Sequence, residues 1–393
     1  MLDKEEINEK IDCNYIRNIL CELIKIKSVN PPENNGEEEI AKFLCTEMKK
    51  LGLKVHFDKV APGRANAIGE LEGKGEGPTC ILNGHLDVVP AKPELWNTDP
   101  FMPEIKNGRM YGRGTSDMKG AIASMLGAIK YICEENVDFK GKLILSFVCD
   151  EETGNMGVND FLKKYPPAQC AIIGEPTNLK VEIGHRGMMS ILVKTFGVSG
   201  HASEPDYAVN AIYKMKKVLE EIQLYAEELK KRKHNSLPLP TIAVTKIQAG
   251  DKINVIPSSC EITMDRRSMP GETREGVLKE IESIFERIKK DDSNFSYSIE
   301  AKEHPYIPPA QIDLDSEFLK KIKKLYSEYF SVKTDHFNYF RAGCEQVYFL
   351  SKGIDTVVFG PGNVSQAHTV NEYIEIEQLY KAAGFYAFCV LNQ

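Results

Sequence analysis

The sequence contains no apolar run of about 18 residues, the length that a membrane-spanning helix needs, so a membrane protein is not expected. Its first residues, Met1 to Glu6, are acidic rather than apolar, which argues against a secretory signal. The 50 Lys and Arg residues are outnumbered by 57 Asp and Glu, and the net charge of −7 disfavours a nucleic-acid partner. None of the ten cysteines forms a C-x-x-C pair, so we expect free thiols in the reducing cytoplasm.

The distribution of apolar residues predicts two domains. Hydrophobic residues make up 42% of the 393 residues, which is typical of a globular protein too long for one core. In residues 1–186 helical patterns alternate with short apolar strands, and the same alternation returns in residues 304–393. Residues 187–303 instead combine alternating strands with long helices at about 206–231 and 272–290. We therefore predict an α/β domain with a mostly parallel sheet and helices on both faces, interrupted by a smaller α+β domain.

Four predicted strands, at 79–83, 142–148, 170–173 and 356–359, each lead to an acid or a histidine. Open α/β sheets place their ligand sites at the carboxyl ends of such strands. One more acid lies in a glycine-rich loop before a predicted helix at 118–132. The residues, in chain order, are His85 with Asp87, Asp117, Glu151 with Glu152, Glu175, and His368.

Five of these side chains, two imidazoles and three carboxylates, exceed the three protein ligands that one catalytic zinc ion needs. Two metal ions that share one carboxylate would use all five. Mixed nitrogen and oxygen ligands suit zinc, with cobalt or manganese as replacements. The consecutive acids Asp150, Glu151 and Glu152 repel one another, and a cation would relieve that repulsion. One of the two glutamates can bind metal while the other transfers protons.

Each of these residues also has an ordinary structural explanation. A single His-x-Asp sequence such as His85 to Asp87 is often structural, and consecutive acids are common on solvated surfaces. Asp117 could be the N-cap of the helix that follows it. The alternatives weaken when the residues are taken together, because four strands deliver them to the same edge of one sheet.

In their order and spacing, these motifs resemble those of the co-catalytic di-zinc aminoacylase and carboxypeptidase family. Acetylornithine deacetylase and succinyl-diaminopimelate desuccinylase are members. The resemblance extends from Asn30 to Tyr373. It implies two zinc ions per subunit, with Asp117 bridging them. The ligands implied for the first ion are His85, Asp117 and Glu175, and those for the second are Asp117, Glu152 and His368.

The same resemblance implies further roles in catalysis. Glu151 corresponds to the general base that activates the water molecule between the metals. Asp87 corresponds to the acid that orients His85, and the peptide bond between Asp117 and Met118 corresponds to one that is often cis.

The inserted segment, residues 187–303, resembles the lid or dimerisation domain of that family. His201 matches the histidine that stabilises the oxyanion, which the partner subunit supplies in dimeric members, so a homodimer through the lid is implied. Asn254 and Arg267 match residues near the substrate, and Arg267 would hold a substrate carboxylate through two parallel hydrogen bonds. The structural alternatives are a plain surface position for His201 and a surface salt bridge for Arg267.

The predicted function is metal-dependent hydrolysis of the amide bond of a small N-acyl amino acid in cytoplasmic amino-acid metabolism. The segment 360–368 resembles acetylornithine deacetylase, whereas 339–346 departs from the Ser-Gly-Gly-Thr-Ser-Asp of desuccinylases, so the acyl group stays open. A dipeptidase or metallo-carboxypeptidase acting on short peptides is the alternative. A non-catalytic, metal-stabilised binding protein is a remoter one, because Glu151 and all five predicted ligands are present.

Overall fold

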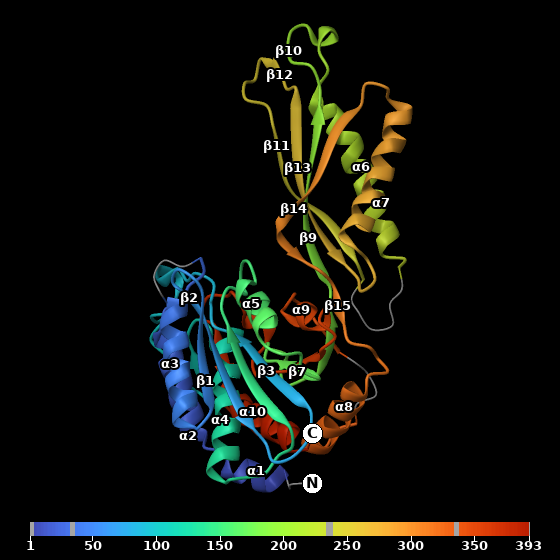
Figure 1. Ribbon diagram of the computed structural model, residues 1–393. Coiled ribbons are helices and arrows are strands. Elements are labelled where there is room, and N and C mark those ends of the chain that lie inside the picture. The colour runs from blue at the N-terminus through green and yellow to red at the C-terminus, as the bar shows by residue number, and fades with distance from the viewer. Residues whose placement is uncertain (1–3, 32–35, 233–238, 334–337, 393) are drawn as a thin grey trace. The chain divides into compact units, whose positions relative to one another are not determined.

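The computed structural model describes residues 4–31, 36–232, 239–333 and 338–392, which divide into two compact units (Figure 1). The first unit comprises Met1–Gly184 and Gln311–Gln393, and the second comprises His185–Ala310. The inserted unit ends later than residue 303 because strand β14 (Ser296–Ile307) continues beyond that position. Within the described residues, no helix has the length and apolar character to cross a membrane.

A mixed nine-stranded sheet forms the centre of the first unit. Its four central strands, β6, β3, β7 and β17, are parallel to one another, whereas β1 pairs antiparallel with β2, β2 with β6, and β8 with β17. The α/β class is therefore confirmed, with parallel pairing confined to the centre. In spatial order the strands are β1 (Lys54–Ala61), β2 (Arg64–Glu72), β6 (Lys142–Val148), β3 (Thr79–His85), β7 (Cys170–Ile173), β17 (Asp355–Val358), β8 (Glu182–His185) and β15 (Ala310–Gln311), with β16 (Asn338–Phe340) beside β8.

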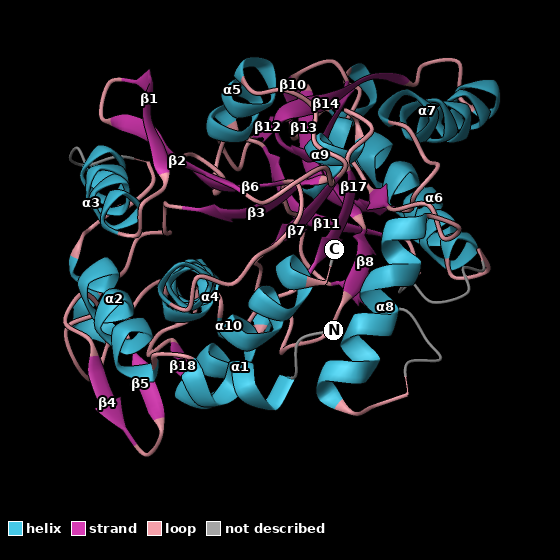
Figure 2. Cartoon of the chain, turned by 60° about the horizontal axis from the view of Figure 1, so that its bottom comes forward, coloured by secondary structure: helices cyan, strands magenta, loops and turns pink. Residues whose placement is uncertain are grey.

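Helices cover both faces of this sheet, as expected (Figure 2). On one face α5 (Met156–Lys164) and α9 (Gln346–Leu350) contribute Val158, Phe161 and Phe349 to a buried apolar cluster. On the other face α4 (Gly120–Glu134) is buried along almost its whole length, because it packs against the sheet as well as neighbouring helices. The remaining helices of this unit are α1 (Lys4–Lys10), α2 (Cys13–Lys25), α3 (Gly36–Lys50), α8 (Glu317–Phe330) and α10 (Ile376–Leu391).

A small three-stranded sheet ties the end of the chain to the loop before α4. Its strands are β4 (Glu104–Lys106), β5 (Arg109–Tyr111) and β18 (Tyr373–Glu375), and Tyr373 pairs with Tyr111. The pairing brings Glu372 beside the glycine-rich loop, where its carbonyl accepts the N–H of Gly112 at 3.0 Å.

The second unit is an α+β domain built on a four-stranded antiparallel sheet. The strand order is β11 (Thr241–Ala249), β13 (Ser259–Ser268), β9 (Gly187–Phe196) and β14. Buried and exposed residues alternate along β9 and β13, because only one sheet face packs against α6 (Ala211–Leu229) and α7 (Arg274–Asp291). The apolar pattern of residues 253–264 indicates one strand, but Pro257 and Ser258 separate β12 (Val255–Ile256) from β13, and β12 pairs with β10 (Gly200–His201).

Candidate metal centre

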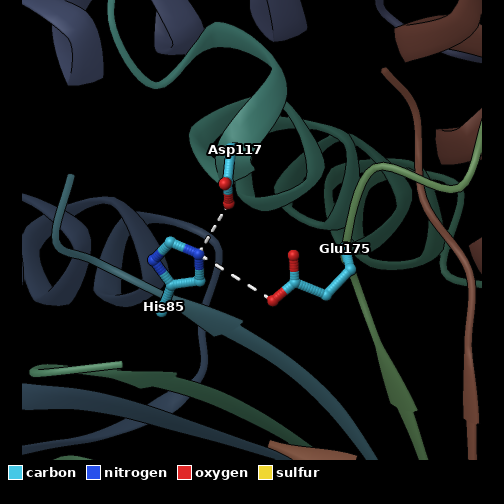
Figure 3. A group of neighbouring side chains, drawn as sticks. All are labelled: His85, Asp117 and Glu175. Carbon is cyan, nitrogen blue, oxygen red and sulfur yellow. Dashed lines mark hydrogen bonds and ion pairs between the residues drawn. The ribbon is translucent and has the colours of Figure 1, made fainter. Parts of the chain in front are cut away.

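Three side chains from three elements meet at the carboxyl edge of the central sheet (Figure 3). His85 ends β3, Glu175 follows β7, and Asp117 lies in the turn 115–119 before α4. The Nε2 atom of His85 lies 2.9 Å from Oδ1 of Asp117 and 3.9 Å from Oε1 of Glu175. Their ligand atoms all lie within 4.8 Å of one another, which is close enough to surround one metal ion.

Asp117 also belongs to a second group of the same kind, with Glu152 and His368. The Nε2 atom of His368 lies 3.0 Å from Oε2 of Glu152 and 3.4 Å from Oδ2 of Asp117. The two oxygen atoms of Asp117 thus face different groups, Oδ1 towards His85 and Oδ2 towards His368. A carboxylate placed in this way can bridge two metal ions.

The imidazole of His85 is set in the tautomer that a metal ligand needs. It is 1% exposed, and its Nδ1–H donates to the backbone carbonyl of Asp87 at 3.0 Å. A neutral ring held in this way carries its lone pair on Nε2, the atom that faces Asp117 and Glu175.

Asp87 contacts His85 and also supports the turn after β6. Its Oδ1 atom is 3.6 Å from Nδ1 of His85, so the carbonyl contact is the shorter one. The carboxylate accepts the backbone N–H groups of Glu151 at 3.1 Å and Glu152 at 3.0 Å. Asp87 therefore holds His85 through its carbonyl and the turn after β6 through its side chain.

Asp117 is not a helix cap. Asp117 and Met118 have non-helical backbone angles, the peptide bond between them is cis as the resemblance implied, and α4 begins only at Gly120. The helix predicted from Met118 therefore starts two residues late. This local geometry turns the carboxylate of Asp117 towards the two histidines.

Glu372 holds the backbone of this turn in place. Its carboxylate is buried, and it accepts N–H groups of Gly114 at 3.0 Å, Ser116 at 2.8 Å and Asp117 at 3.1 Å. It also accepts a hydrogen bond from Arg113 at 2.7 Å. Sequence patterns alone give Glu372 no role, although its position four residues after His368 is a signal that could identify it.

The centre carries an excess of buried acid. Burial raises the pKa of Glu175 well above its usual range, and the charge of Asp117 raises it further. Burial likewise raises the pKa of Glu151, with Glu175 adding to the effect against the opposing influence of His85. Hydrogen bonds to Asp117 and Glu152 raise the pKa of His368 to about 10. Acids that destabilise one another in this way, with imidazoles between them, are a donor set that a divalent cation would neutralise.

The structure places the three remaining candidates in the second unit. His201 and Asn254 are neighbours, because His201 pairs with Val255 and the carbonyl of Asn254 accepts the N–H of Ala202 at 3.0 Å. Arg267 is the second-last residue of β13. Its guanidinium donates hydrogen bonds of 2.8 and 3.2 Å to the carboxylate of Asp265. The surface salt bridge considered for Arg267 is therefore present, on the sheet face that the helices leave uncovered.

Fold and site together indicate a metal-dependent hydrolase, since imidazoles and carboxylates gathered at a sheet edge are the ligands of such enzymes. Residues 81–392 match Peptidase family M20/M25/M40. Acetylornithine deacetylase from Aliivibrio salmonicida is 33% identical over 365 residues, which is 90% of this chain and 92% of that protein. The corresponding protein from Salmonella typhimurium is 32% identical over 363 residues, 90% of this chain and 91% of that one. The chain belongs to Peptidase family M20/M25/M40 and is a hydrolase of amide bonds, as expected.

Solved structures show the same fold. Aminopeptidase PepT from Bacillus cereus matches with a TM-score of 0.80 at 21% identity, covering 98% of this chain and 99% of that one. Human carnosine dipeptidase 1 matches with a TM-score of 0.74 at 16% identity, covering 99% and 98%. A dinuclear metal-binding peptidase from Bacillus subtilis matches with a TM-score of 0.73 at 16% identity, covering 96% and 97%.

Proposed function

We propose that this protein removes the acyl group from a small N-acyl amino acid, with N-acetylornithine as the first substrate to test, and that it binds two zinc ions per subunit. The position of Asp117 carries the proposal, because its two oxygen atoms face two separate groups of histidine and carboxylate. His85 and Glu175 would complete the site for one ion, and Glu152 and His368 the site for the other. Cobalt or manganese would suit the same ligands.

Bound metal ions would supply Lewis acidity and lower the pKa of a water molecule between them towards neutrality. Glu151 is the residue that we assign to proton transfer. Its backbone N–H is held by Asp87, and it follows directly after the sheet edge at which the ligand candidates gather. Glu151 would take the proton of the attacking water and later give it to the leaving amine, so that one residue serves as base and then as acid.

His201 would stabilise the negative charge that develops on the carbonyl oxygen. Its Nδ1 atom accepts the backbone N–H of Ser203 at 3.2 Å, so the neutral ring carries its proton on Nε2. The ring is exposed on β10, where this N–H is available to a substrate. We assign Asn254, beside it, to substrate binding, and Arg267 to the substrate carboxylate.

Strand length supports a homodimer in which partner subunits share a site. β13 runs from Ser259, five residues after Asn254, to Ser268, the residue after Arg267. Ser259 and Arg267 are eight positions apart along an extended strand, a distance of about 27 Å, which is more than a small substrate spans. If His201 and Arg267 act on the same substrate, they come from different chains, as a two-fold dimer allows.

Exposed apolar residues of the second unit offer a surface for such a dimer. β11 is an outer strand of its sheet and leaves Ile247 54% exposed, and α6 leaves Tyr213 70% exposed. An outer strand with unpaired backbone groups favours pairing with a second copy of the chain.

The relatives support two classes of substrate. The acetylornithine deacetylases match at 32–33% identity, which supports an N-acyl amino acid. The structural neighbours include a tripeptidase from Staphylococcus aureus and the carnosine dipeptidase, which support a short peptide as the second candidate. An N-succinyl substrate is a third. We place the activity in the cytoplasm, in keeping with ten free cysteines, six of which are buried.

A substrate panel tests this function directly. Purified protein, freed of metal and then reconstituted with zinc or cobalt, is offered N-acetyl-L-ornithine, other N-acetyl amino acids, N-succinyl amino acids, dipeptides and tripeptides. Metal-dependent release of acetate, with the highest kcat/KM among N-acetyl amino acids, supports the proposal. Preferred cleavage of peptides would replace it with the peptidase function, and no cleavage of any amide with metal bound would overturn it.

A further inference from the structure

The turn that carries Glu151 and Glu152 has a backbone conformation that its residues do not favour by themselves. Asp150, its first residue, has a φ of 69°, in the left-handed region that a residue with a side chain seldom adopts. Asp150 is also 1% exposed, so its carboxylate requires buried partners. Within the turn, the hydroxyl of Thr153 and the backbone N–H of Met156 donate to this carboxylate at 2.5 and 3.1 Å. Contacts from other parts of the chain hold it as well, since a strained conformation persists only where its surroundings impose it.

Among the described residues, Arg64 is the only arginine or lysine in contact with that carboxylate. It is the first residue of β2 and is 7% exposed. One terminal nitrogen of its guanidinium donates to Oδ1 of Asp150 and lies 3.2 Å from Oε2 of Glu37. Glu37, in turn, accepts the backbone N–H of Asp150 at 2.8 Å. Arg64 thus fixes Asp150 through its side chain and, by way of Glu37, through its backbone.

The other terminal nitrogen of Arg64 starts a second path to the same turn. It donates to Oδ1 of Asn30 at 2.8 Å, and the amide nitrogen of Asn30 donates to Oδ2 of Asp87 at 2.6 Å. Asp87 then accepts the N–H groups of Glu151 and Glu152. Both paths consist of buried groups, so water cannot replace a partner that is removed.

The charges explain why a cation is needed at this position. Asp87 and Asp150 are two buried carboxylates joined by one side chain, because the amide of Asn30 lies 2.6 Å from one and 3.2 Å from the other. The guanidinium of Arg64 is the positive group within this network. Lysine could keep the charge but could not direct two nitrogens along both paths.

We propose that Arg64 is a positioning residue for hydrolysis. Its guanidinium fixes the turn 150–152 from two directions and so places the base Glu151 and the metal ligand Glu152. This inference rests on the function proposed above. It assigns a role in catalysis to a residue whose side-chain partners are Glu37, Asp150 and Asn30, none of which is among the five ligand candidates.

Four variants of the full-length, zinc-loaded protein test it: Arg64→Met, Arg64→Lys, Asp150→Asn, and the double variant Arg64→Met with Asp150→Asn. Arg64→Met should lower kcat for N-acetyl-L-ornithine about 100-fold with little change in KM, because a misplaced base slows the chemical step. Arg64→Lys should recover about tenfold of that loss, because it restores the charge but only one of the two paths. If Arg64 acts through Asp150, the double variant should lose no more than the worse single variant.

Metal affinity gives a second measurement that does not depend on turnover. Competition with a chelator should show that Arg64→Met weakens one of the two zinc ions about tenfold, the usual effect of losing a partner behind a ligand. The zinc-affinity measurement still tests the role of Arg64 if the wild-type protein cleaves none of the panel substrates. That result would overturn the proposed function but not the role of Arg64 in placing Glu152. Should Arg64→Met fail to fold, Arg64→Lys and Asp150→Asn carry both measurements.

Phe388→Ala serves as the control for simple destabilisation. Phe388 is buried in α10 against Tyr329 of α8, with ring centroids 5.6 Å apart, and it belongs to none of the contacts above. It should lower the unfolding free energy while kcat and zinc affinity stay within about twofold of wild type. A folded Arg64→Met protein with wild-type kcat and zinc affinity would overturn the inference. So would losses in the double variant that simply multiply those of the two single variants.

Discussion

Glu372 and Asp117 are 255 positions apart in the sequence, yet the carboxylate of Glu372 accepts the backbone N–H of Asp117 at 3.1 Å. The same carboxylate accepts the N–H groups of Gly114 and Ser116, so it fixes the whole turn that presents Asp117 to the two histidines. Asp87 does the same for the turn with Glu151 and Glu152. Both turns are thus held by a buried carboxylate from a distant segment, which explains why irregular backbone can hold its side chains in place.

Changing Glu372→Gln should weaken this support. A glutamine amide has only one acceptor oxygen, whereas both oxygens of Glu372 accept hydrogen bonds from backbone N–H groups. We expect kcat to fall about 100-fold and zinc affinity about tenfold or more. Titration with a chelating dye and steady-state kinetics measure the two effects. Glu375→Gln is the matched control, since it removes only a half-exposed ion pair with Arg109, and equal losses in both variants would contradict the assigned role.

Stability should depend on pH through Glu37. Burial raises its pKa to about 8, and the charge of Asp87 adds to this against the opposing effect of Arg64. The unfolded chain has the ordinary value of about 4.3, so the folded protein binds more protons between these values. The stability that Glu37 provides is therefore complete below about pH 4 and is lost as the pH rises through about 8.

Glu37→Gln removes this dependence because its side chain is neutral at every pH. Relative to wild type, the variant should gain stability as the pH rises from about 5 to about 8, by at most about 1.4 kcal/mol per pH unit. Urea unfolding of metal-free protein at several pH values measures the difference. Glu38→Gln, on the same helix, should show no such gain, because a hydrogen bond to Lys42 lowers the pKa of Glu38. Parallel pH profiles for wild type and Glu37→Gln would contradict the assignment.

The two neighbouring arginines of β13 should behave differently. Arg266 is fully buried and contacts both oxygens of Glu272, at 3.0 and 3.1 Å, so Arg266→Met should lower the melting temperature of the protein. Arg267 is 31% exposed, so Arg267→Lys should leave stability unchanged but raise KM for carboxylate substrates about tenfold. An unchanged KM would show that the contact with Asp265 is all that Arg267 does.

Mixed dimers test the sharing of sites between subunits. Glu151→Ala and His201→Ala proteins, each inactive, are combined and allowed to exchange subunits. Half of the dimers are then mixed and half of their sites are complete, so activity should return to about a quarter of wild type. Mixing Glu151→Ala with Glu152→Ala is the control and should restore nothing, because each site then keeps one defect. Without recovery after proven exchange, His201 would have no role across the interface.

Residues that follow a buried strand could be predicted well from the sequence. Strand β6 has the expected bounds, and because it is apolar and precedes Glu151 and Glu152, it predicted their place at a sheet edge. A local pattern is sufficient for this prediction, because the apolar strand and the acids that follow it lie within a few residues of each other. The interruption between β12 and β13 at Pro257 could not be seen in the pattern. Val255 and Ile256 before it are apolar like the strand that follows, so the two strands look like one.

Contacts made across the fold could not be predicted in this way. Arg64 starts β2, a strand that the sequence analysis did not identify, and its partners Asn30 and Asp150 are distant in the chain. The carbonyl contact of Asp87 depends on backbone direction, which periodicity does not specify. Asp117 was found, but the helix that follows it starts later than its apolar pattern indicates because the turn before Gly120 is not helical.

The number of metal ions per chain, measured together with the activity of two glutamate variants, tests the central claim most directly. Zinc content by mass spectrometry should approach two per chain in the wild type and in Glu151→Gln, and fall in Glu152→Gln. Glu151→Gln should nevertheless lose at least about 100-fold in kcat, because it keeps the ligands and loses only the base. One zinc ion per saturated wild-type chain, or a Glu151→Gln protein that retains most of its kcat, would contradict the account.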